Sequence, residues 1–257
     1  MSTSGIFPLI RFITTSSTNE VAMQMALQGG KHGTVVVADQ QTHGRGRGAK
    51  LYASPPGGLY MSVILRPELP LDRLPFITLA GGLACARAVE EHTGLAVALK
   101  WPNDLYLQGR KLGGILAQTG PYSPAVHAIP FVVLGIGINV NTRRESFAPE
   151  LRNIVISLYD TKAELYGIDS LLAAVHAHLC AQLVQLREDI AGVVNEWRQR
   201  DYLLGRAVTW QEMGKTMSGL GAGISDDGCY QLQAADGTLH AILAGEVTIG
   251  PVPDEEK

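Results

Sequence analysis

Two periodicities of apolar residues alternate along the first 140 positions of the chain. Ser17 and Glu20 have the S-x-x-E spacing of a helix capping box, and the apolar positions after them end at Gly29-Gly30, so we predict a helix over residues 17–28. A longer apolar stretch over residues 74–92 is closed by Gly94 and predicts a second helix.

Short runs rich in β-branched and other apolar residues separate and follow these helices, as buried strands do. The predicted strands span residues 34–38, 59–65, 95–100, 105–107, 112–118 and 131–140. Gln108, Gly109 and Arg110 lie between two of them and are expected to form a hairpin turn. Strands and helices that alternate in this way predict an α/β domain.

The pattern changes after residue 145, where apolar residues recur at helical spacing and predict two helices that cover the sheet. The first apolar stripe is Leu171, Val175, Leu179, Leu183 and Leu186, and the second is Val193, Val194 and Trp197. From Gly205 onward, short β-rich stretches separated by glycines indicate a small β-barrel. We therefore expect a larger domain over residues 1–204 and a small one over residues 205–257.

Composition narrows the functional classes. The 257 residues carry a net charge of −3, and only 18% are charged while 46% are hydrophobic, which excludes a disordered chain and argues against one that coats nucleic acid. The three cysteines, Cys85, Cys180 and Cys229, are too few and too scattered for a disulfide framework. With no signal-peptide pattern and no apolar run near the ~18 residues of a membrane span, we expect a cytoplasmic protein.

The most informative stretch is the loop over residues 40–50, just after a predicted strand, in which Gly44, Gly46 and Gly48 alternate with Arg45 and Arg47. Glycine lets a backbone approach a ligand closely, and each guanidinium can grip a carboxylate or a phosphate in two places. The loop therefore suits an anionic ligand. On local composition alone, a solvated basic loop or a nucleic-acid contact of the RGG kind is an equal alternative.

Two later stretches add candidate residues. The run from Lys100 to Asp104 lies at a strand end, and Lys111 opens the next strand, where its ammonium can neutralise a carboxylate or a phosphate. A polar hairpin with surface charges has the same local pattern. Gly135 and Gly137 lie within one strand, which indicates that something packs closely on its backbone, but the G-x-G-x-x-G of a dinucleotide site is absent.

Three other patterns are set aside by their spacing. Gly214-Lys215-Thr216 resembles the end of a phosphate loop, but Thr209 stands where that motif requires glycine. His176 and Cys180 lie four residues apart on a helix without a second pair of metal ligands nearby. No G-x-S-x-G sequence is present to support a hydrolase serine.

In their order along the chain, the candidate stretches resemble the motifs of the biotin protein ligases. The matching segments are Ser17-Thr18-Asn19, Gln41 to Arg47, Lys100 to Asp104, Lys111 to Leu116, Gly135 to Asn139 and Gly245-Glu246-Val247. The resemblance implies an α/β (α+β) catalytic domain of the biotin/lipoate ligase type with a small SH3-like C-terminal domain. It also implies two half-reactions: biotin and Mg-ATP give biotinyl-5′-AMP and pyrophosphate, and a carrier lysine then takes the biotin.

The resemblance also implies roles for individual residues. Contacts to biotin are expected from Ser17, Thr18, Asn19, Gln41, Arg45, Gly46, Arg47 and Lys111. Arg45, Arg47 and Lys111 are the expected catalytic residues, because a carboxylate and a triphosphate repel each other and need fixed positive charge to meet. ATP or the adenylate is expected at Asn103, Asn139 and Tyr52, and Mg²⁺ at Asp104.

The sequence departs from the family in its glycine-arginine loop. Family loops often run G-R-G-R-R-G-R-x-W, whereas Gly48 stands here in place of an arginine and Tyr52 in place of the tryptophan. Tyr52 keeps a flat apolar face for an adenine, and Lys50 can compensate for the missing arginine. Because the first motif begins at residue 17, we expect a monofunctional ligase without the DNA-binding helix-turn-helix of the repressor-type ligases.

The expected partner is the biotin carboxyl carrier protein of acetyl-CoA carboxylase or of a related carboxylase, with neither DNA nor a membrane as a partner. Homodimers occur in the family, but no segment of this sequence marks such a surface. A lipoate or octanoate ligase is the nearest alternative, although its R-R-x-x-G-G-G loop is missing. A non-catalytic nucleotide or nucleic-acid binding module is the alternative from another class, and the net charge of −3 weighs against it.

Overall fold

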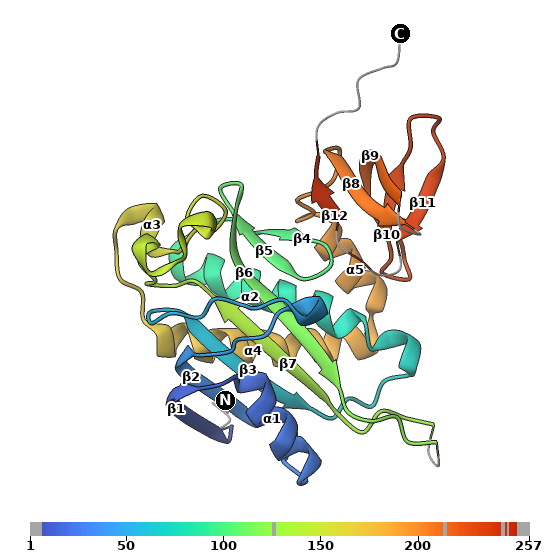
Figure 1. Cartoon of the computed structure of the whole chain (residues 1–257). Coiled ribbons are helices and arrows are strands. Elements are labelled where there is room, and N and C mark those ends of the chain that lie inside the picture. Colours follow the sequence, from blue (N-terminus) through green and yellow to red (C-terminus); the bar gives the residue numbers. More distant parts are fainter. Residues whose placement is uncertain (1–6, 125–126, 213–214, 243–244, 246, 251–257) are drawn as a thin grey trace.

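The larger part of the protein is built around a seven-stranded mixed sheet in the order β1-β2-β3-β7-β6-β5-β4 (Figure 1). The structure is a computed structural model that describes residues 7–124, 127–212, 215–242, 245 and 247–250. The strands are β1 (Leu9–Thr15), β2 (Val35–Gln41), β3 (Leu59–Leu65), β4 (Ala98–Lys100), β5 (Asp104–Leu107), β6 (Arg110–Thr119) and β7 (Val132–Ile138). β1 and β2 are parallel, and the other neighbours are antiparallel.

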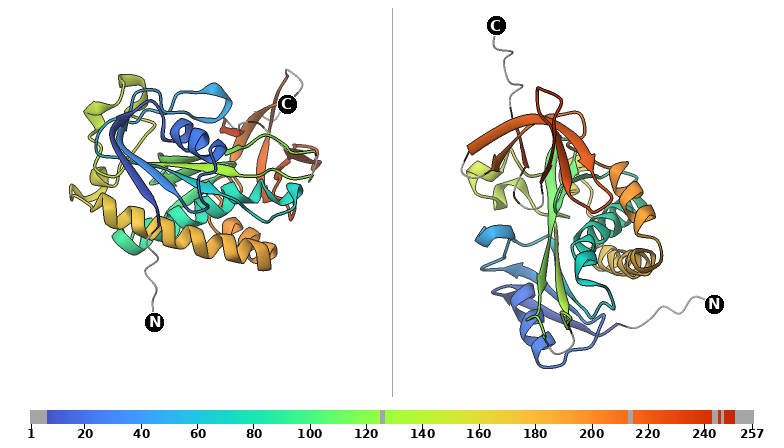
Figure 2. Two further views of the ribbon diagram at one scale, coloured as in Figure 1. Left: turned by 90° about the horizontal axis from the view of Figure 1, so that it is seen from below. Right: turned by 90° about the vertical axis from the view of Figure 1, so that its right-hand side faces the viewer.

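Helices cover the two faces of this sheet unequally (Figure 2). α1 (Thr18–Leu27) lies on one face, whereas α2 (Phe76–Thr93), α4 (Ile168–Glu188) and α5 (Ile190–Arg198) lie on the other. The short helix α3 spans Tyr159–Lys162, and 3₁₀ turns lie at Arg47–Ala49, Leu71–Arg73, Arg144–Ser146 and Pro149–Leu151. The predicted apolar stripe of α4 is buried in the main core, except that Leu183 is half-buried. The helix α4 therefore covers the sheet as predicted and contacts β3, whereas α5 packs against α2, α4 and β9.

Most predicted elements are confirmed, with boundaries shifted by a few residues. Gly94 ends α2 with φ +69°, a left-handed conformation that glycine adopts without strain. The hairpin turn between β5 and β6 is present, with φ +50° at Gln108 and φ +77° at Gly109. The strand expected from residue 95 begins only at Ala98, as β4.

Two local features differ from the sequence interpretation. The pattern did not predict β1, because Leu9 and Ile13 are exposed and the strand forms through its parallel pairing with the buried β2. The capping box is also absent. Ser17 precedes α1 without a side-chain cap bond and is buried, while Glu20 instead accepts hydrogen bonds from Ser16 at 2.9 Å and from Arg45.

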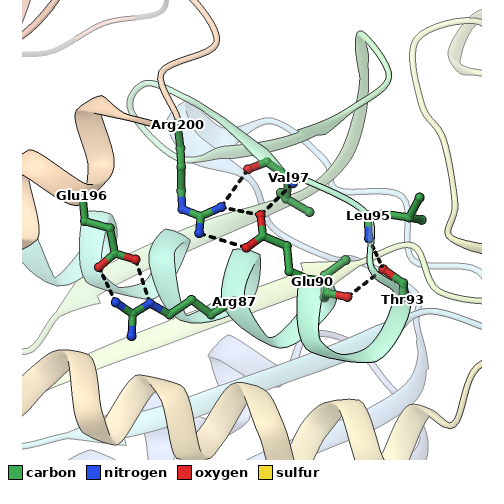
Figure 3. Close-up of polar contacts among 8 residues, drawn as sticks. Arg87, Glu90, Thr93, Leu95, Val97, Glu196 and Arg200 are labelled. Carbon is green, nitrogen blue, oxygen red and sulfur yellow. Dashed lines mark hydrogen bonds and ion pairs between the residues drawn. The ribbon is translucent and has the colours of Figure 1, made fainter.

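Ion pairs fix α5 and the residues after it against α2 (Figure 3). Arg87 donates to both carboxylate oxygens of Glu196, at 2.7 and 2.6 Å. Arg200 pairs with Glu90, whose carboxylate also accepts the backbone N–H of Val97 at 3.1 Å. Burial alone would raise the pKa of Glu90, but these two donors outweigh it and hold that pKa below its usual value. The end of α5 is therefore anchored beside β4.

A five-stranded antiparallel sheet, which we call the C-terminal sheet, has the order β11-β10-β9-β8-β12. Its strands are β8 (Ala207–Glu212), β9 (Lys215–Ile224), β10 (Tyr230–Gln233), β11 (Leu239–Ile242) and β12 (Val247–Ile249). The segment that leads into it runs beside β4, where the N–H of Tyr202 donates to the carbonyl of Leu99 at 2.9 Å. Asp201 accepts the hydroxyl of Tyr230 at 3.0 Å, and burial raises the pKa of Asp201 to about 6. These contacts join the C-terminal sheet to the edge of the main sheet.

The patterns set aside above gain no support from the structure. His176 Nδ1 and Cys180 Sγ lie 3.9 Å apart, and the described residues contain no group of three potential metal ligands. Thr216 belongs to β9, and Gly214 lies outside the described residues. All three cysteines are free. Among the described helices, none combines the length and hydropathy that crossing a membrane requires.

Candidate active site

A cavity of about 470 Å³ gathers most of the residues that the sequence analysis selected. It is bounded by the start of α1, the loop after β2, the glycines of β6 and β7, and the turn between β4 and β5. Its lining includes Ser17, Thr18, Asn19, Gln41, Arg45, Gly46, Arg47, Tyr52, Asn103, Asp104 and Lys111. The fold therefore brings together motifs that are more than one hundred residues apart in the chain, and Arg47 and Gly245 in this cavity are separated by 198.

The end of the cavity at α1 is formed by Thr18, Asn19 and Gln41, which we call the polar cradle. Gln41 Oε1 accepts the backbone N–H of Thr18 at 2.8 Å and lies 3.1 Å from its hydroxyl. Asn19 Nδ2 donates to Gln118 Oε1 at 2.9 Å, and Asn19 Oδ1 accepts the Ser62 hydroxyl at 2.6 Å. Thr18, Asn19 and Ser62 are buried, so this network holds the cradle in one orientation. Ser62 and Gln118 were not predicted as site residues, because they lie outside the matched motifs.

The glycines of β7 let side chains lie directly on the sheet, as the sequence predicts. A Cβ placed on Gly135 would come within 2.0 Å of Asn19 Oδ1, and one on Gly137 within 2.5 Å of Cε1 of Tyr52. The groups that pack on this backbone are thus the protein's own cradle and its Tyr52 ring. Any larger residue at these positions would displace them.

Lys111 and Asp104 form an ion pair on the strand side of the cavity. Lys111 lies at the start of β6 and Asp104 at the start of β5, and the pairing of these strands brings Lys111 Nζ within 2.6 Å of Asp104 Oδ1. The side chains are 30% and 19% exposed, so water screens the pair only in part. The pairing of the strands therefore fixes the positive charge of Lys111 at the cavity before a ligand binds, and Asp104 is its ion-pair partner.

The two loop arginines line the cavity, but each is bound by the protein itself. Arg45 Nε donates to Glu20 Oε1 at 2.7 Å, and this bond, with a second one from Ser16, holds the pKa of Glu20 below its usual value. Arg47 donates to the carbonyl oxygen of Gly245, at 2.5 Å, between β11 and β12. The loop thus bridges α1 and the C-terminal sheet.

Of the three residues expected to bind the nucleotide, two line the cavity and one does not. Tyr52 and Asn103 line the cavity, and Asn103 Nδ2 donates to the carbonyl of Ile115 at 2.7 Å. The hydroxyl of Tyr52 is buried without a partner among the described residues, and burial raises its pKa well above the usual value. Asn139 is different: it does not line the cavity, is 3% exposed, and donates to the carbonyl of Ile156 at 3.1 Å.

Several lining residues were not selected as site residues from the sequence. Lys100, Trp101 and Pro102 line the cavity beside Asn103, and their membership of one motif was the available signal. Gly245 also lines it, although 198 residues separate it from Arg47. Its place in a glycine motif near the chain end could not indicate that contact, because the docking of the C-terminal sheet creates it.

Comparisons with known proteins show the family of the chain. The sequence profile of the Biotin/lipoate A/B protein ligase family matches residues 10–139. The Bifunctional ligase/repressor BirA of Bacillus subtilis is 32% identical over 246 residues, which cover 94% of this chain and 74% of that protein. The Biotin--[acetyl-CoA-carboxylase] ligase of Mycobacterium tuberculosis is 30% identical over 240 residues, covering 91% and 85%.

A solved structure shows the same architecture. The biotin protein ligase from Aquifex aeolicus, in complex with biotin and ATP, superposes with a TM-score of 0.81 at 29% sequence identity. The superposition covers 94% of this chain and 97% of that chain. The two-sheet fold, the ordered motifs and these matches together show that the chain belongs to the Biotin/lipoate A/B protein ligase family, with biotin protein ligases as its relatives.

Proposed function

We propose that the protein is an ATP-dependent biotin–[biotin carboxyl-carrier protein] ligase. In the first half-reaction, the carboxylate of biotin attacks the α-phosphate of ATP and gives biotinyl-5′-AMP and pyrophosphate. In the second, a carrier lysine attacks the acyl carbon and AMP leaves. The observation that carries this proposal is the cavity that joins the polar cradle to the Lys111–Asp104 pair and two arginines.

The polar cradle suits the ring end of biotin. The ureido group of biotin offers N–H donors and a carbonyl acceptor, and hydroxyl and carboxamide side chains match both kinds of group. We therefore assign Ser17, Thr18, Asn19 and Gln41 to hydrogen bonds with biotin, and Gly46 to close approach of the loop backbone. The hydrogen bond that Asn19 accepts from Ser62 and the one that it donates to Gln118 keep it oriented before biotin arrives.

The charges of the cavity suit the activation step. Lys111 is positioned to stabilise the negative charge that biotin's carboxylate and the α-phosphate share when they meet. Arg45 and Arg47 would contact the same anion by sharing their five N–H donors between it and their present partners. A loop that covers the acyl-adenylate also keeps out water, which would hydrolyse it. We assign Arg45, Arg47 and Lys111 as the catalytic residues and as contacts to biotin.

The nucleotide would lie against Tyr52 and Asn103. The Tyr52 ring offers an apolar face to an adenine, and Asn103 stands beside it on the cavity wall. Asn139 does not line the cavity, so we do not propose for it the contact to the nucleotide that is expected from the sequence. Its amide is committed to the carbonyl of Ile156, so we assign it to holding the end of β7 against that segment.

Mg²⁺ would accompany ATP in the cavity. This ion is commonly held by one or two carboxylates together with substrate phosphates and waters, so a single carboxylate fits. Asp104 supplies that carboxylate, with Lys111 as its present partner. When bound, the ion would neutralise phosphate charge.

The proposal also covers the domain boundaries, the protein partner and the cellular compartment. The C-terminal sheet begins at Ala207, which supports a catalytic domain over residues 1–204 and an SH3-like domain over residues 205–257. The carrier protein of acetyl-CoA carboxylase or a related carboxylase is the proposed partner, consistent with the name of the Mycobacterium tuberculosis relative. Three free cysteines agree with a reducing cytoplasm.

A transfer assay tests the proposal. The protein is incubated with ATP, a carboxyl carrier domain, and either labelled biotin or labelled lipoate, and the label in the carrier is measured. We expect biotin to be transferred and lipoate not. Transfer of lipoate in preference to biotin would assign the protein to the other branch of the family, and no transfer to a competent carrier would overturn the ligase function.

A further inference from the structure

A second cavity, of about 200 Å³, adjoins the first. Apolar side chains form most of its wall, namely those of Phe76, Leu79, Trp101, Ile115 and Ala117. Six residues line both cavities and mark where the two meet: Arg47, Trp101, Pro102, Asn103, Ile115 and Leu116. The second cavity is thus lined mostly by apolar side chains, with Arg47 as its charged group and Asn103 as its carboxamide.

The second cavity lies where β6 loses one neighbouring strand. β5 pairs with β6 only as far as Gly114, which lies opposite Asp104, and β6 continues to Thr119. Gly114 lines only the first cavity and Ala117 only the second, while Leu116 between them lines both. The two cavities therefore adjoin along the edge of β6, where Asn103 is hydrogen-bonded to the backbone of Ile115.

The C-terminal sheet supplies the far wall. Trp101 Nε1 donates to the carbonyl of Gly228, in the turn between β9 and β10, at 3.2 Å. A Cβ on Gly228 would lie 3.1 Å from the ring of Phe76, so this turn is packed against the start of α2. At the rim, Pro75 and Arg47 are exposed and Thr78 is half-buried, which leaves the cavity accessible from solvent.

We propose that the second cavity admits the side chain of the carrier's acceptor lysine, an inference that rests on the proposed ligase function. Biotin and ATP both bring negative charge and suit the cationic first cavity. The third reactant is a primary amine at the end of a four-carbon stem. Apolar walls match that stem, and the polar junction at Asn103 lies where the amine must arrive.

The same walls favour the reactive form of the amine. An apolar channel desolvates an ammonium group and Arg47 repels it, and both effects lower the pKa of an approaching lysine. In the transfer step, the amine nitrogen forms a bond to the acyl carbon of biotinyl-5′-AMP, and the bond from that carbon to the phosphate oxygen breaks. AMP leaves with the electron pair, and the two protons lost from the original ammonium pass to water.

Filling the channel tests this assignment, because it separates the two half-reactions. Thr78→Trp places an indole in the second cavity from α2. Adenylation is followed by biotin-dependent exchange of pyrophosphate into ATP, and transfer by label reaching a carrier domain. We expect exchange to stay within twofold of the unmodified protein and transfer to fall roughly 10²-fold, as for a misplaced reactant.

Thr161→Trp is the matched control, since Thr161 is also a half-buried threonine in a helix and lines neither cavity. Ala117→Leu narrows the channel from the opposite wall and gives a milder change should the indole disturb folding. Transfer that falls no further in Thr78→Trp and Ala117→Leu than in Thr161→Trp would overturn the assignment.

Two further outcomes separate this inference from the proposed function. If exchange is lost together with transfer in Thr78→Trp and Ala117→Leu, but not in the control, the second cavity holds part of the adenylate and not the lysine. If the unmodified protein itself shows neither exchange nor transfer, the ligase function fails, and the channel assignment fails with it.

Discussion

Two ion pairs at the same cavity differ in how the fold holds them. Lys111 and Asp104 lie on adjacent strands and are 30% and 19% exposed. Arg45 lies on a loop and Glu20 on a helix, and they are 53% and 37% exposed. Backbone pairing positions the first pair and shields it, whereas only the side chains hold the second, in contact with water. The strand pair is built to be in place before a ligand arrives, and the loop pair can exchange partners.

The largest expected effect comes from the strand pair. Lys111→Ala should lower the rate of adenylation roughly 10²-fold or more, because it removes a preorganised charge from the reacting centre. Biotin-dependent pyrophosphate release measures this rate. Lys162→Ala serves as the control, since Lys162 is exposed and donates to the carbonyl of Thr93 instead of facing the cavity. Near-normal release by the Lys111 variant would remove Lys111 from the mechanism.

The second largest effect is expected from substituting Gly135 of β7, which lies beneath the polar cradle. In Gly135→Ala, the new Cβ would lie 2.0 Å from Asn19 Oδ1, so the cradle must shift. Overpacking of this kind costs about 1–3 kcal/mol, and we expect the KM for biotin to rise about tenfold or more. Gly82→Ala is the control, because its Cβ would meet Leu99 at an ordinary 3.5 Å. An unchanged KM for biotin in Gly135→Ala would show that the cradle does not hold biotin.

The loop should matter more for retaining the intermediate than for forming it. Arg47→Gly removes the bond to the Gly245 carbonyl and a charge from the cavity wall, so biotinyl-5′-AMP should escape about tenfold faster. Rapid dilution of preformed adenylate measures its release. Arg47→Lys keeps the charge without the guanidinium fork and should be intermediate. Equal rates of adenylate release in the unmodified protein, Arg47→Gly and Arg47→Lys would show that Arg47 does not retain the intermediate.

The smallest effect is expected from the loop pair. Glu20→Gln should change the KM for biotin less than about fivefold, because exposed ion pairs contribute only about 0.2–1 kcal/mol. The pKa of Glu20 is lowered in the folded protein by Arg45, so its stabilising effect is present at neutral pH and is lost as the pH falls into the acid range. The thermal unfolding midpoints of the unmodified protein and of Glu20→Gln should therefore become equal at low pH. A change in KM as large as that in Gly135→Ala would contradict the distinction between the two pairs.

Sequence patterns were sufficient for elements whose signal is local. The α2 helix ends at Gly94 as predicted, and β3 spans the predicted residues 59–65, because glycine capping and short apolar runs report directly on nearby backbone. β1 was missed because its stability comes from pairing with β2, which a half-exposed segment does not reveal in its own pattern. The capping box was misread for the same reason: Arg45, distant in sequence, takes the Glu20 carboxylate.

The candidate site shows the same division. Motif residues such as Lys111 and Gln41 were found because their chemistry is visible in the sequence, and both line the cavity. Asn139 also belongs to a motif, yet it faces the interior, because burial and not residue type decides whether a carboxamide can reach a ligand. Ser62 and Gln118 could not be selected, since a common polar residue becomes informative only when its hydrogen-bond partner is known.

The sequence by itself determined the fold class, the order of the motifs and the chemical character of the site, because composition, periodicity and residue type are local properties. Only the tertiary structure decided which groups meet: Lys111 with Asp104 across two strands, Arg47 with Gly245 across the two sheets, and a second apolar cavity beside the first. Such contacts depend on strand register and on the docking of the C-terminal sheet. Both are set by the packing of the whole chain, which no single stretch of residues encodes.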